Sequence, residues 1–445
     1  MVQRARLEAE AVAEPDRRAR RPLWWWAVLA LAAIAGGVAF LRKGPSELPV
    51  YVVAGERMLH GAEIYLTTDA KPFTYPPFFA LPFVPFVWLP AGAWRPLWYA
   101  ITLAAFAAVV VLLRRFYTAD FVLAPRARRA FWVVVALLGL RHVLAIFENQ
   151  SHDMVVLLCT VAASLAWARG VDGRAGAWAG LGAACKATPG LFGVPFLLQG
   201  GWRAALAATV VGAAATLLPD LVLPRADGQL WVTAWVHTML AGVQPGAAAD
   251  LGGTWTAGSI LNQSLSGTLY RLTTPVPAGD DSPWVVDAAL VALDPAARHV
   301  VVSVGQALVL ALVAWLARPG VVRRAPFLSF RDLRLAQAAA VACGMVLLSP
   351  MSSKSHFGVL VLPAALAASL LCRGRRDPWL VAFLSGSFVA GTITTKGLVG
   401  SRVGNVLLGY GAVTWSALLL LLATARCVRL LRTQVPASSG RIALD

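Results

Sequence analysis

The stretch PLWWWAVLALAAIAGGVAFL, residues 22–41, decides the fold class of this chain. A helix that crosses a lipid bilayer needs about 20 mostly apolar residues, and this run supplies them without a charge. The whole chain has 445 residues, of which 58% are hydrophobic and only 14% are charged. A soluble domain carries about 25% charged residues, and a membrane β-barrel alternates apolar and polar residues in segments of about ten. The sequence therefore predicts an all-α polytopic membrane protein.

Apolar runs of this kind recur along the chain, at 23–41, 97–116, 130–147, 153–168, 203–222, 298–317, 335–349, 357–372, 378–394 and 404–425. The stretch 175–199 is ambiguous, because Lys186 lies at its middle and is followed by Thr188-Pro189-Gly190. As one span, this stretch would carry a charge at mid-membrane. As two short helices broken at KATPG, it would cross the membrane twice.

The distribution of charge favours two crossings, because cytoplasmic loops carry an excess of Lys and Arg. Two crossings give 12 helices and place both termini in the cytoplasm. The inside loops then hold 26 Arg and 9 acidic residues, a net charge of +17, whereas the outside segments hold 13 basic and 13 acidic residues. Arginines beside membrane spans are typical of topology signals and of contacts to anionic lipid. The expected partner of the basic face is therefore the lipid bilayer, not nucleic acid.

This topology divides the chain into a basic cytoplasmic tail at 1–22, a transmembrane domain at 23–432 and a second cytoplasmic tail at 433–445. The first tail is too long for a typical signal-peptide n-region, so the first apolar run is predicted to be a retained anchor. Two outer loops, 42–96 and 223–297, are much longer than the usual connections of helix bundles. We expect them to build one site on the extracytoplasmic face.

The first outer loop contains the segment YPPFFALPFVPFVWLP, residues 75–90. From Phe78 to Leu89 it would be only ~18 Å long as a helix, too short to cross a hydrocarbon core of about 30 Å. Pro82 and Pro85 also interrupt it. The segment predicts a re-entrant or interfacial element, either an amphipathic anchor or part of a groove for a lipid substrate.

Ionisable residues also occur at predicted membrane depth, where they are costly and are candidates for function. The segment LRHVLAIFENQSHDMVVLLC carries Arg141, and KATPG carries Lys186. The segment SPMSSKSHFGVLVLP carries Lys354 and His356. Structural roles stay open for several of these groups. Glu148 or Asp153 would pair with Arg141, Lys354 would extend to the interface, and His356 would be a capping histidine.

One carboxylate, several cations and a lipid groove on the outer face fit glycosyl transfer from a lipid-linked sugar phosphate. Phosphate is already a good leaving group, so one carboxylate is enough as a base that deprotonates the acceptor hydroxyl. Cationic groups stabilise the charge that develops on the departing phosphate. A glycosidase would need a matched pair of carboxylates, and the spacing identifies none.

The segment ELPVYVVAGERMLHGAEIY…PFTYPPFFALPFVPFVWLP resembles the first outer loop of glycosyltransferase family 87. This family comprises polyprenol-phosphate-mannose-dependent α-mannosyltransferases of GT-C architecture. NQSHDMVVLLC, AGLGAACKATPGLFGVPFLL, NQSLSGTLYRL and LLSPMSSKSHFGVLVLP agree in order, so the resemblance covers most of residues 45–370. It implies a GT-C-like bundle of about 12 transmembrane helices.

The resemblance also implies roles for individual residues. The family's base is an Asp four residues before a Tyr, and this position is occupied by Glu47, with Tyr51 in register. Glutamate is one methylene longer, so either the loop lies slightly further back or Glu56 or Glu63 serves instead. The remaining residues expected to bind substrate are Tyr75 in the lipid groove, Gln150 from the family's G-Q-x-N pattern, Asn262, Gln263, and the phosphate-binding Arg141, Lys186, Arg271 and His356.

The expected function is the transfer of a hexose, mannose by resemblance, from a polyprenyl-phosphate-sugar donor to a glycolipid or glycan acceptor. The protein is expected in the bacterial inner membrane, with its active site outside. No cofactor or metal is expected, because the outer loops contain no D-x-D, although Asp280-Asp281 is an acidic pair. Two alternatives stay open, a transporter or lipid flippase and a family member that binds the lipid-linked sugar without catalysis.

Overall fold

The computed structural model describes residues 23–44, 46–119, 125–240, 257–277, 282–321 and 327–433. Within these ranges the chain is helical and contains no strand, which confirms the predicted all-α class. The chain divides into two compact units, Met1–Gly44 and Pro45–Asp445. The described part of the first unit is α2 (Leu23–Arg42), a helix of 20 residues that coincides with the run quoted above.

Six described helical segments are long and apolar enough to cross a membrane. They are α4 (Ala91–Ala119), α5 (Pro125–Asn149), α9 (Trp202–Val222), α12 (Pro295–Ala317), η5 with α14 (Lys354–Leu360 and Val361–Cys372) and α18 (Ala412–Arg432). Shorter apolar helices lie between them, including α6 (Asp153–Ala168) and the segment Pro378–Ile393. The protein is therefore polytopic, whereas the count of 12 crossings stays a prediction.

The first outer loop folds into α3 (Leu48–Leu59) and η1 (Pro77–Trp88). η1 is a 3₁₀ helix of 12 residues that contains Pro82 and Pro85, so it matches the short, proline-interrupted element expected at 75–90. α3 lies directly on η1 at Gly55, where a Cβ would stand 2.7 Å from the Phe83 carbonyl carbon. The absence of a side chain at Gly55 lets the helix that follows Glu47 approach the aromatic segment.

The ambiguous stretch 175–199 forms a broken hairpin. α7 (Asp172–Cys185) ends at Lys186, whose backbone is extended at φ −160° and ψ 125°, and η2 (Thr188–Phe192) and α8 (Gly193–Leu198) follow. α7 packs closely on α9, because a Cβ at Gly176 would lie 2.0 Å from the Ala204 carbonyl oxygen. Small residues permit such close approach of helices in membranes. The predicted break at KATPG is confirmed.

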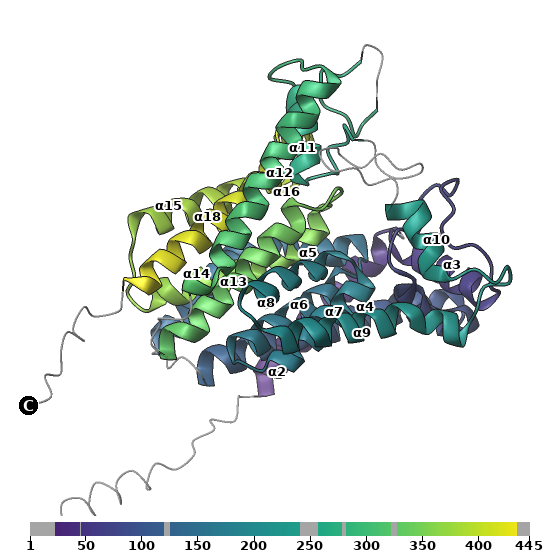
Figure 1. Ribbon diagram of the computed structural model, residues 1–445, viewed down its shortest axis with the longest axis horizontal. Coiled ribbons are helices and arrows are strands. Elements are labelled where there is room, and N and C mark those ends of the chain that lie inside the picture. Colours follow the sequence, from purple (N-terminus) through teal and green to yellow (C-terminus); the bar gives the residue numbers. More distant parts are fainter. Residues whose placement is uncertain are drawn as a thin grey trace, which may run out of the picture. The chain divides into compact units, whose positions relative to one another are not determined.

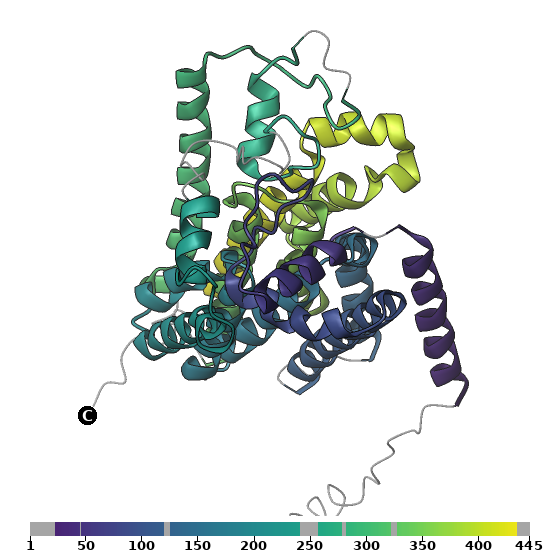
Figure 2. The same cartoon turned by 90° about the vertical axis from the view of Figure 1, so that its right-hand side faces the viewer.

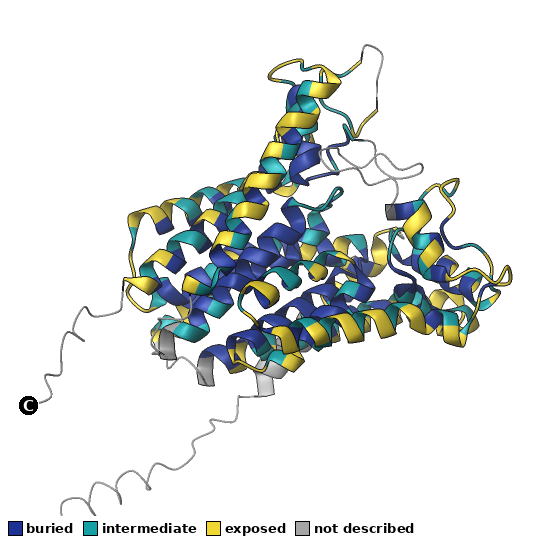
Figure 3. Cartoon of the chain, in the orientation of Figure 1, coloured by how far each residue is buried: buried dark blue, intermediate teal, exposed yellow. Residues whose placement is uncertain are grey.

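α6, α13 (Phe327–Leu347) and α14 form the interior of the second unit. Figure 3 shows these helices in dark blue over most of their length, whereas α9 and α12 are mostly exposed or intermediate. The exposed residues of α9 and α12 include many large apolar side chains, such as Leu221, Val210 and Leu308. An apolar outer surface is expected where helices face lipid hydrocarbon.

The second outer loop contributes α10 (Trp231–Trp235), η3 (Val236–Leu240) and α11 (Leu265–Thr273). Residues 241–256 and the acidic pair at 280–281 lie outside the described residues. α11 runs beside the first turns of α12 (Figures 1 and 2), where Arg298 donates a hydrogen bond of 2.8 Å to the Thr274 hydroxyl. α11 is thereby held against a predicted membrane helix.

The predicted span 378–394 agrees with the observed helices, whereas the last predicted span does not. The elements after α14 are α15 (Pro378–Phe388), the π-helix η6 (Val389–Ile393), α16 (Lys396–Val399) and α17 (Ser401–Gly409). The predicted span 404–425 is wrong, because the chain turns at Gly411, where φ is +78°, and α18 begins at Ala412. A left-handed residue ends a helix, so the long C-terminal helix covers 412–432 instead.

Candidate active site

Glu47 lies where α3 begins, and its backbone is anchored to the end of α5. The Glu47 N–H donates a hydrogen bond of 3.3 Å to the Asn149 carbonyl. The side-chain Oε1 accepts an ion-pairing hydrogen bond of 2.5 Å from the Lys71 ammonium, and the Glu47 side chain is 15% exposed. The described residues offer Oε2 no hydrogen-bond donor, so one oxygen of this carboxylate is available.

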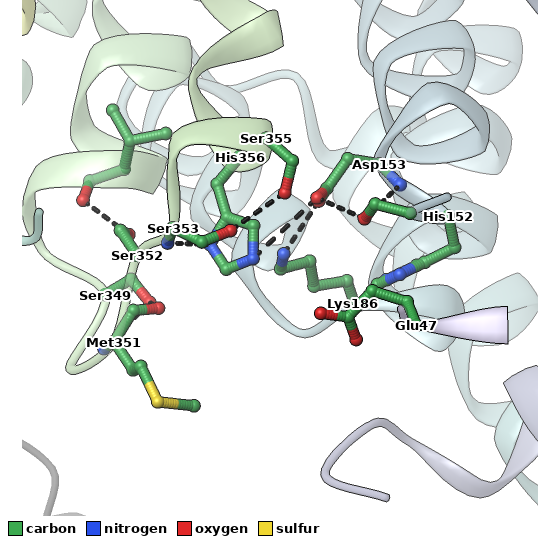
Figure 4. Close-up of polar contacts among 12 residues, drawn as sticks. Glu47, His152, Asp153, Lys186, Ser349, Met351, Ser352, Ser353, Ser355 and His356 are labelled. Carbon is green, nitrogen blue, oxygen red and sulfur yellow. Dashed lines mark hydrogen bonds and ion pairs between the residues drawn. The ribbon is translucent and has the colours of Figure 1, made fainter. Parts of the chain in front are cut away.

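Burial raises the pKa of Glu47 above its ordinary value, because desolvation disfavours the carboxylate. The ammonium of Lys71 opposes this shift. The charges of Asp153 and Lys186 act on Glu47 as well, in opposite directions. Glu47 therefore lies close enough to Asp153 and Lys186 to interact with their charges, although these residues belong to other parts of the chain (Figure 4).

Asp153 is the centre of a second ionic group. Its Oδ1 accepts a hydrogen bond of 2.8 Å from the Lys186 ammonium, and its Oδ2 accepts one of 2.6 Å from the Ser151 hydroxyl. The Nε2 of His356 lies 3.7 Å from Oδ2. Asp153 opens α6, Lys186 stands at the break after α7, and His356 lies on η5. The ends of three helices thus bring together a carboxylate, an ammonium and an imidazole. These three residues also line a small cavity.

The ring of His356 is oriented by the preceding turn. The Ser353 N–H donates a hydrogen bond of 3.2 Å to His356 Nδ1. Because Nδ1 accepts this bond, the neutral imidazole carries its proton on Nε2. That N–H is directed to the side of the cavity where Asp153 and Lys186 lie, so His356 is a hydrogen-bond donor there (Figure 4).

Tyr51 and Tyr75 join an aromatic cluster beside these groups. The Tyr51 hydroxyl and His152 Nδ1 are 3.1 Å apart, and the Tyr75 and His152 rings have centroids 4.2 Å apart. Phe79 of η1 contacts the same histidine, with centroids 4.4 Å apart. The cluster fixes α3 and η1 to the residue that precedes Asp153, so the first outer loop and α6 form one structural unit.

Gln150 lies in the turn between α5 and α6 and has a positive φ of +53°. Its carbonyl accepts a hydrogen bond of 2.8 Å from the Trp98 indole, and the residue is buried. A left-handed conformation is uncommon for a residue other than glycine. This turn places Ser151, His152 and Asp153 beside Glu47.

A different cluster contacts the loop that precedes His356. It consists of Asn262, Gln263 and Arg271. The Arg271 guanidinium donates to the carbonyl oxygens of Ser259, Asn262, Leu408 and Gly409 and to the Thr268 hydroxyl. The Asn262 Oδ1 accepts from the Ser352 N–H at 3.1 Å, and the Gln263 N–H donates to the Ser352 carbonyl at 2.6 Å. These three predicted residues therefore brace the segment before His356.

Arg141 lies apart from the Asp153 group. Its guanidinium contacts both carboxylate oxygens of Glu148 at 3.2 Å, so Glu148 rather than Asp153 is its partner. The two reserve acids are also placed elsewhere. Glu63 pairs with Arg225 at 2.8 Å, and Glu56 is exposed on α3. The structure thus brings together Glu47, Tyr51, Tyr75, Gln150, Lys186 and His356 of the predicted set.

Sequence reasoning missed Lys71 and gave Asp153 no role in the site. Lys71 is 24 positions from Glu47, in a loop without a pattern that predicts a contact. Asp153 is the first residue of an apolar run, within the segment NQSHD. An acid at the predicted end of a membrane helix was the available signal, because such groups are usually paired.

Comparison with known proteins identifies the family of the chain. The model of glycosyltransferase family 87 matches residues 73–350. The chain belongs to glycosyltransferase family 87. The matched range contains Asp153 and Lys186 but begins after Glu47 and ends before His356.

Two relatives of the chain have the same name, polyprenol-phosphate-mannose-dependent alpha-(1-2)-phosphatidylinositol mannoside mannosyltransferase. The protein from Mycobacterium tuberculosis (strain ATCC 25618 / H37Rv) is 31% identical over 388 residues, which cover 81% of this chain and 80% of the relative. The protein from Mycolicibacterium smegmatis (strain ATCC 700084 / mc(2)155) is 26% identical over 422 residues, which cover 87% and 85%. This family 87 protein is therefore a membrane glycosyltransferase.

Proposed function

We propose that this family 87 enzyme transfers mannose from a polyprenyl-phosphate-mannose donor to a hydroxyl of a phosphate-bearing glycolipid. The names of both relatives support the donor, and their word mannoside supports a glycolipid acceptor. The observation that carries the proposal is the meeting of an available carboxylate, Glu47, with the Lys186–Asp153–His356 group.

Glu47 is the general base of the proposed reaction. Asp153 is engaged by Lys186, Ser151 and His356, and its side chain is only 4% exposed. Glu47 has one partner and one available oxygen, and burial makes it more basic than an ordinary carboxylate. A general base is most effective when its pKa is near the working pH, so the environment of Glu47 suits this role better.

Lys186 and His356 hold the donor phosphate. An ammonium has three donor hydrogens, and Asp153 accepts from Lys186 through one oxygen, so further donors remain for phosphate oxygens. The His356 Nε2–H supplies another donor. The acceptor oxygen forms a bond to the anomeric carbon while the bond from that carbon to the phosphate oxygen breaks. The acceptor proton goes to Glu47, polyprenyl phosphate leaves with the bonding electrons, and the single displacement inverts the anomeric carbon.

The other predicted residues have supporting roles in this proposal. Tyr51 and Tyr75 build the wall between Glu47 and η1, which lines the groove for the polyprenyl chain. Gln150 sets the turn that positions Asp153. Asn262, Gln263 and Arg271 hold the segment that orients His356.

The proposed location is the bacterial plasma membrane, with both termini in the cytoplasm and Glu47 on the extracytoplasmic side. The net charge of +17 on the predicted inner loops supports this orientation. The donor phosphate then lies at the level of the lipid headgroups, where the first outer loop can reach it. No metal or cofactor takes part in the proposed reaction, and addition of a chelator to the transfer assay tests that absence.

The test is sugar transfer by the purified protein from synthetic polyprenyl-phosphate-mannose to phosphatidylinositol mannoside, compared for wild type and Glu47→Gln. Loss of a general base reduces kcat by about 10²- to 10⁴-fold, while the donor Kd stays close to wild type. Glu56→Gln is the matched control, because Glu56 is an exposed glutamate of the same helix. Near-normal turnover by Glu47→Gln would remove Glu47 as the base. Donor binding without turnover in the wild type, with several acceptors, would instead indicate a non-catalytic member of the family.

A further inference from the structure

A second small cavity lies on another side of η5. It is lined by Arg141, His142, Ala145, Lys354, Gly391, Thr394, Thr395, Leu408 and Val413. Lys354 and His356 are two residues apart on η5, yet Lys354 lines this cavity and His356 lines the one beside Asp153. One short helix thus separates two sets of cationic and hydrogen-bonding groups.

His142 is a buried residue of the cavity lining, with a ring nitrogen that is unpartnered within the described part of the chain. The residue is only 2% exposed, and its Nε2 has no hydrogen-bond partner among the described residues. Nε2 faces the π-helix η6 at Gly391, where a Cβ would lie 3.1 Å from it. The interior of the cavity has space for one group of the size of a water molecule, or of a phosphoryl oxygen. π-helical turns occur frequently at functional sites.

An open apolar groove adjoins this cavity, and Thr394 lines both. The other residues that line the groove include Val389, Leu407, Tyr410 and Trp415. Trp415 also lines a further open apolar groove on α12 and α18. These apolar residues are partly exposed on helices of a membrane protein, so the surface that they form is accessible to lipid chains.

We propose that the cavity and these grooves bind the phosphate-bearing acceptor lipid, with its phosphate at Arg141, His142 and Lys354 and its chains along the apolar surface. This inference rests on the proposed function and adds a second phosphate site, separate from that of the donor. The acceptor phosphate and the donor phosphate would be bound on different sides of η5.

Glu148 is the acidic group that competes with such a phosphate for Arg141. Its side chain is 47% exposed, and all of its contacts with Arg141 are 3.2 Å or longer. Exposed ion pairs of this kind contribute little to stability, so the guanidinium can exchange Glu148 for a phosphodiester. A guanidinium is suited to that exchange because its fork of donors matches two phosphate oxygens.

The test measures binding of phosphatidylinositol to the full chain in detergent micelles, for wild type, Arg141→Gln, His142→Leu and Arg402→Gln. Arg402 is an exposed arginine of α17 and controls for general attraction of anionic lipid. Loss of a charged hydrogen bond typically weakens binding about tenfold. We expect that loss for Arg141→Gln and no change for Arg402→Gln. Diacylglycerol lacks the phosphate and is expected to bind weakly to all four proteins. Inorganic phosphate lacks the acyl chains and is also expected to bind weakly.

Enzyme kinetics separate this inference from the proposed function. In the transfer assay, Arg141→Gln is expected to raise the KM for the acceptor about tenfold and to leave the KM for the donor unchanged. Lys186→Met is expected to show the opposite pattern. Equal binding of phosphatidylinositol by wild type, Arg141→Gln and His142→Leu would overturn the acceptor site and would assign the space beside His142 to a water molecule. The transfer reaction itself could still be intact in that case.

Discussion

Lys71 and Glu47 form an ion pair that controls the basicity of the proposed general base. Burial raises the pKa of Glu47, and Lys71 is the largest influence that lowers it. The two residues are 24 positions apart, and Lys71 lies in an irregular loop, so only the folded loop brings the ammonium to the carboxylate. No sequence pattern therefore predicts this ion pair, although the sequence does predict Glu47 as a site residue.

Replacement of Lys71 by methionine is expected to shift the pH dependence of transfer. Without the ammonium, the pKa of Glu47 rises further, so more of the carboxylate is protonated at a given acidic pH. The acid limb of kcat/KM against pH then moves to higher pH, while activity at alkaline pH is retained. Arg57→Met is the control, because Arg57 forms an ion pair with Asp69 in the same loop. An unchanged acid limb in Lys71→Met would mean that Glu47 is not the group that titrates.

For the other site residues, too, the sequence predicts the residue but not its partner. Lys186 and His356 were predicted because ionisable groups at membrane depth need a function or a partner. Their shared partner, Asp153, could not be identified from the sequence. The sequence does not show that the start of α6, the end of α7 and the start of η5 lie close together. Arg271 was expected to bind phosphate from the family resemblance, whereas the structure surrounds it with backbone carbonyls. Charge and depth therefore predict candidate residues, and only tertiary packing pairs them.

At the scale of elements, hydrophobicity predicted helices well and helix ends less well. The break at KATPG was predicted because a charge, a proline and a glycine coincide there. The break at Gly411 was not, because the sequence around it, LLGYGAVTW, stays apolar through the turn. There the reason is contact with another element. A Cβ at Gly411 would lie 2.2 Å from the Thr268 side chain of α11.

Gly411→Ala is expected to destabilise the protein more than Gly374→Ala. Both glycines have a φ near +80°, so both substitutions introduce about 1–2 kcal/mol of backbone strain. Gly374 has open space around it, whereas Gly411 lies against α11, and overpacking adds about 1–3 kcal/mol. Thermal unfolding in detergent compares the two variants. Equal midpoints would show that α11 does not rest against the turn before α18.

At the scale of the whole molecule, the charge distribution makes a prediction that the helix boundaries do not test. The stretch 175–199 is a broken hairpin, and its two short helices can cross the membrane twice or can together cross it once. If it crosses twice, residues 318–334 are cytoplasmic, and the turn that contains α16 is outside with Glu47. If it crosses once, both positions exchange sides and the asymmetry of +17 disappears.

Single cysteines at four exposed positions distinguish these topologies in a Cys372→Ser background. Thr68 and Gly173 are references, because Thr68 is outside and Gly173 inside in either topology. Gly320 and Gly397 discriminate, and a side chain at either has open space. A membrane-impermeant maleimide added to intact cells is expected to label Thr68→Cys and Gly397→Cys. The variants Gly173→Cys and Gly320→Cys should be labelled only after permeabilisation. Labelling of Gly320→Cys with protection of Gly397→Cys would contradict the double crossing. It would also place the Asn262 and Arg271 cluster on the face opposite Glu47, although its hydrogen bonds to Ser352 hold it beside the His356 loop.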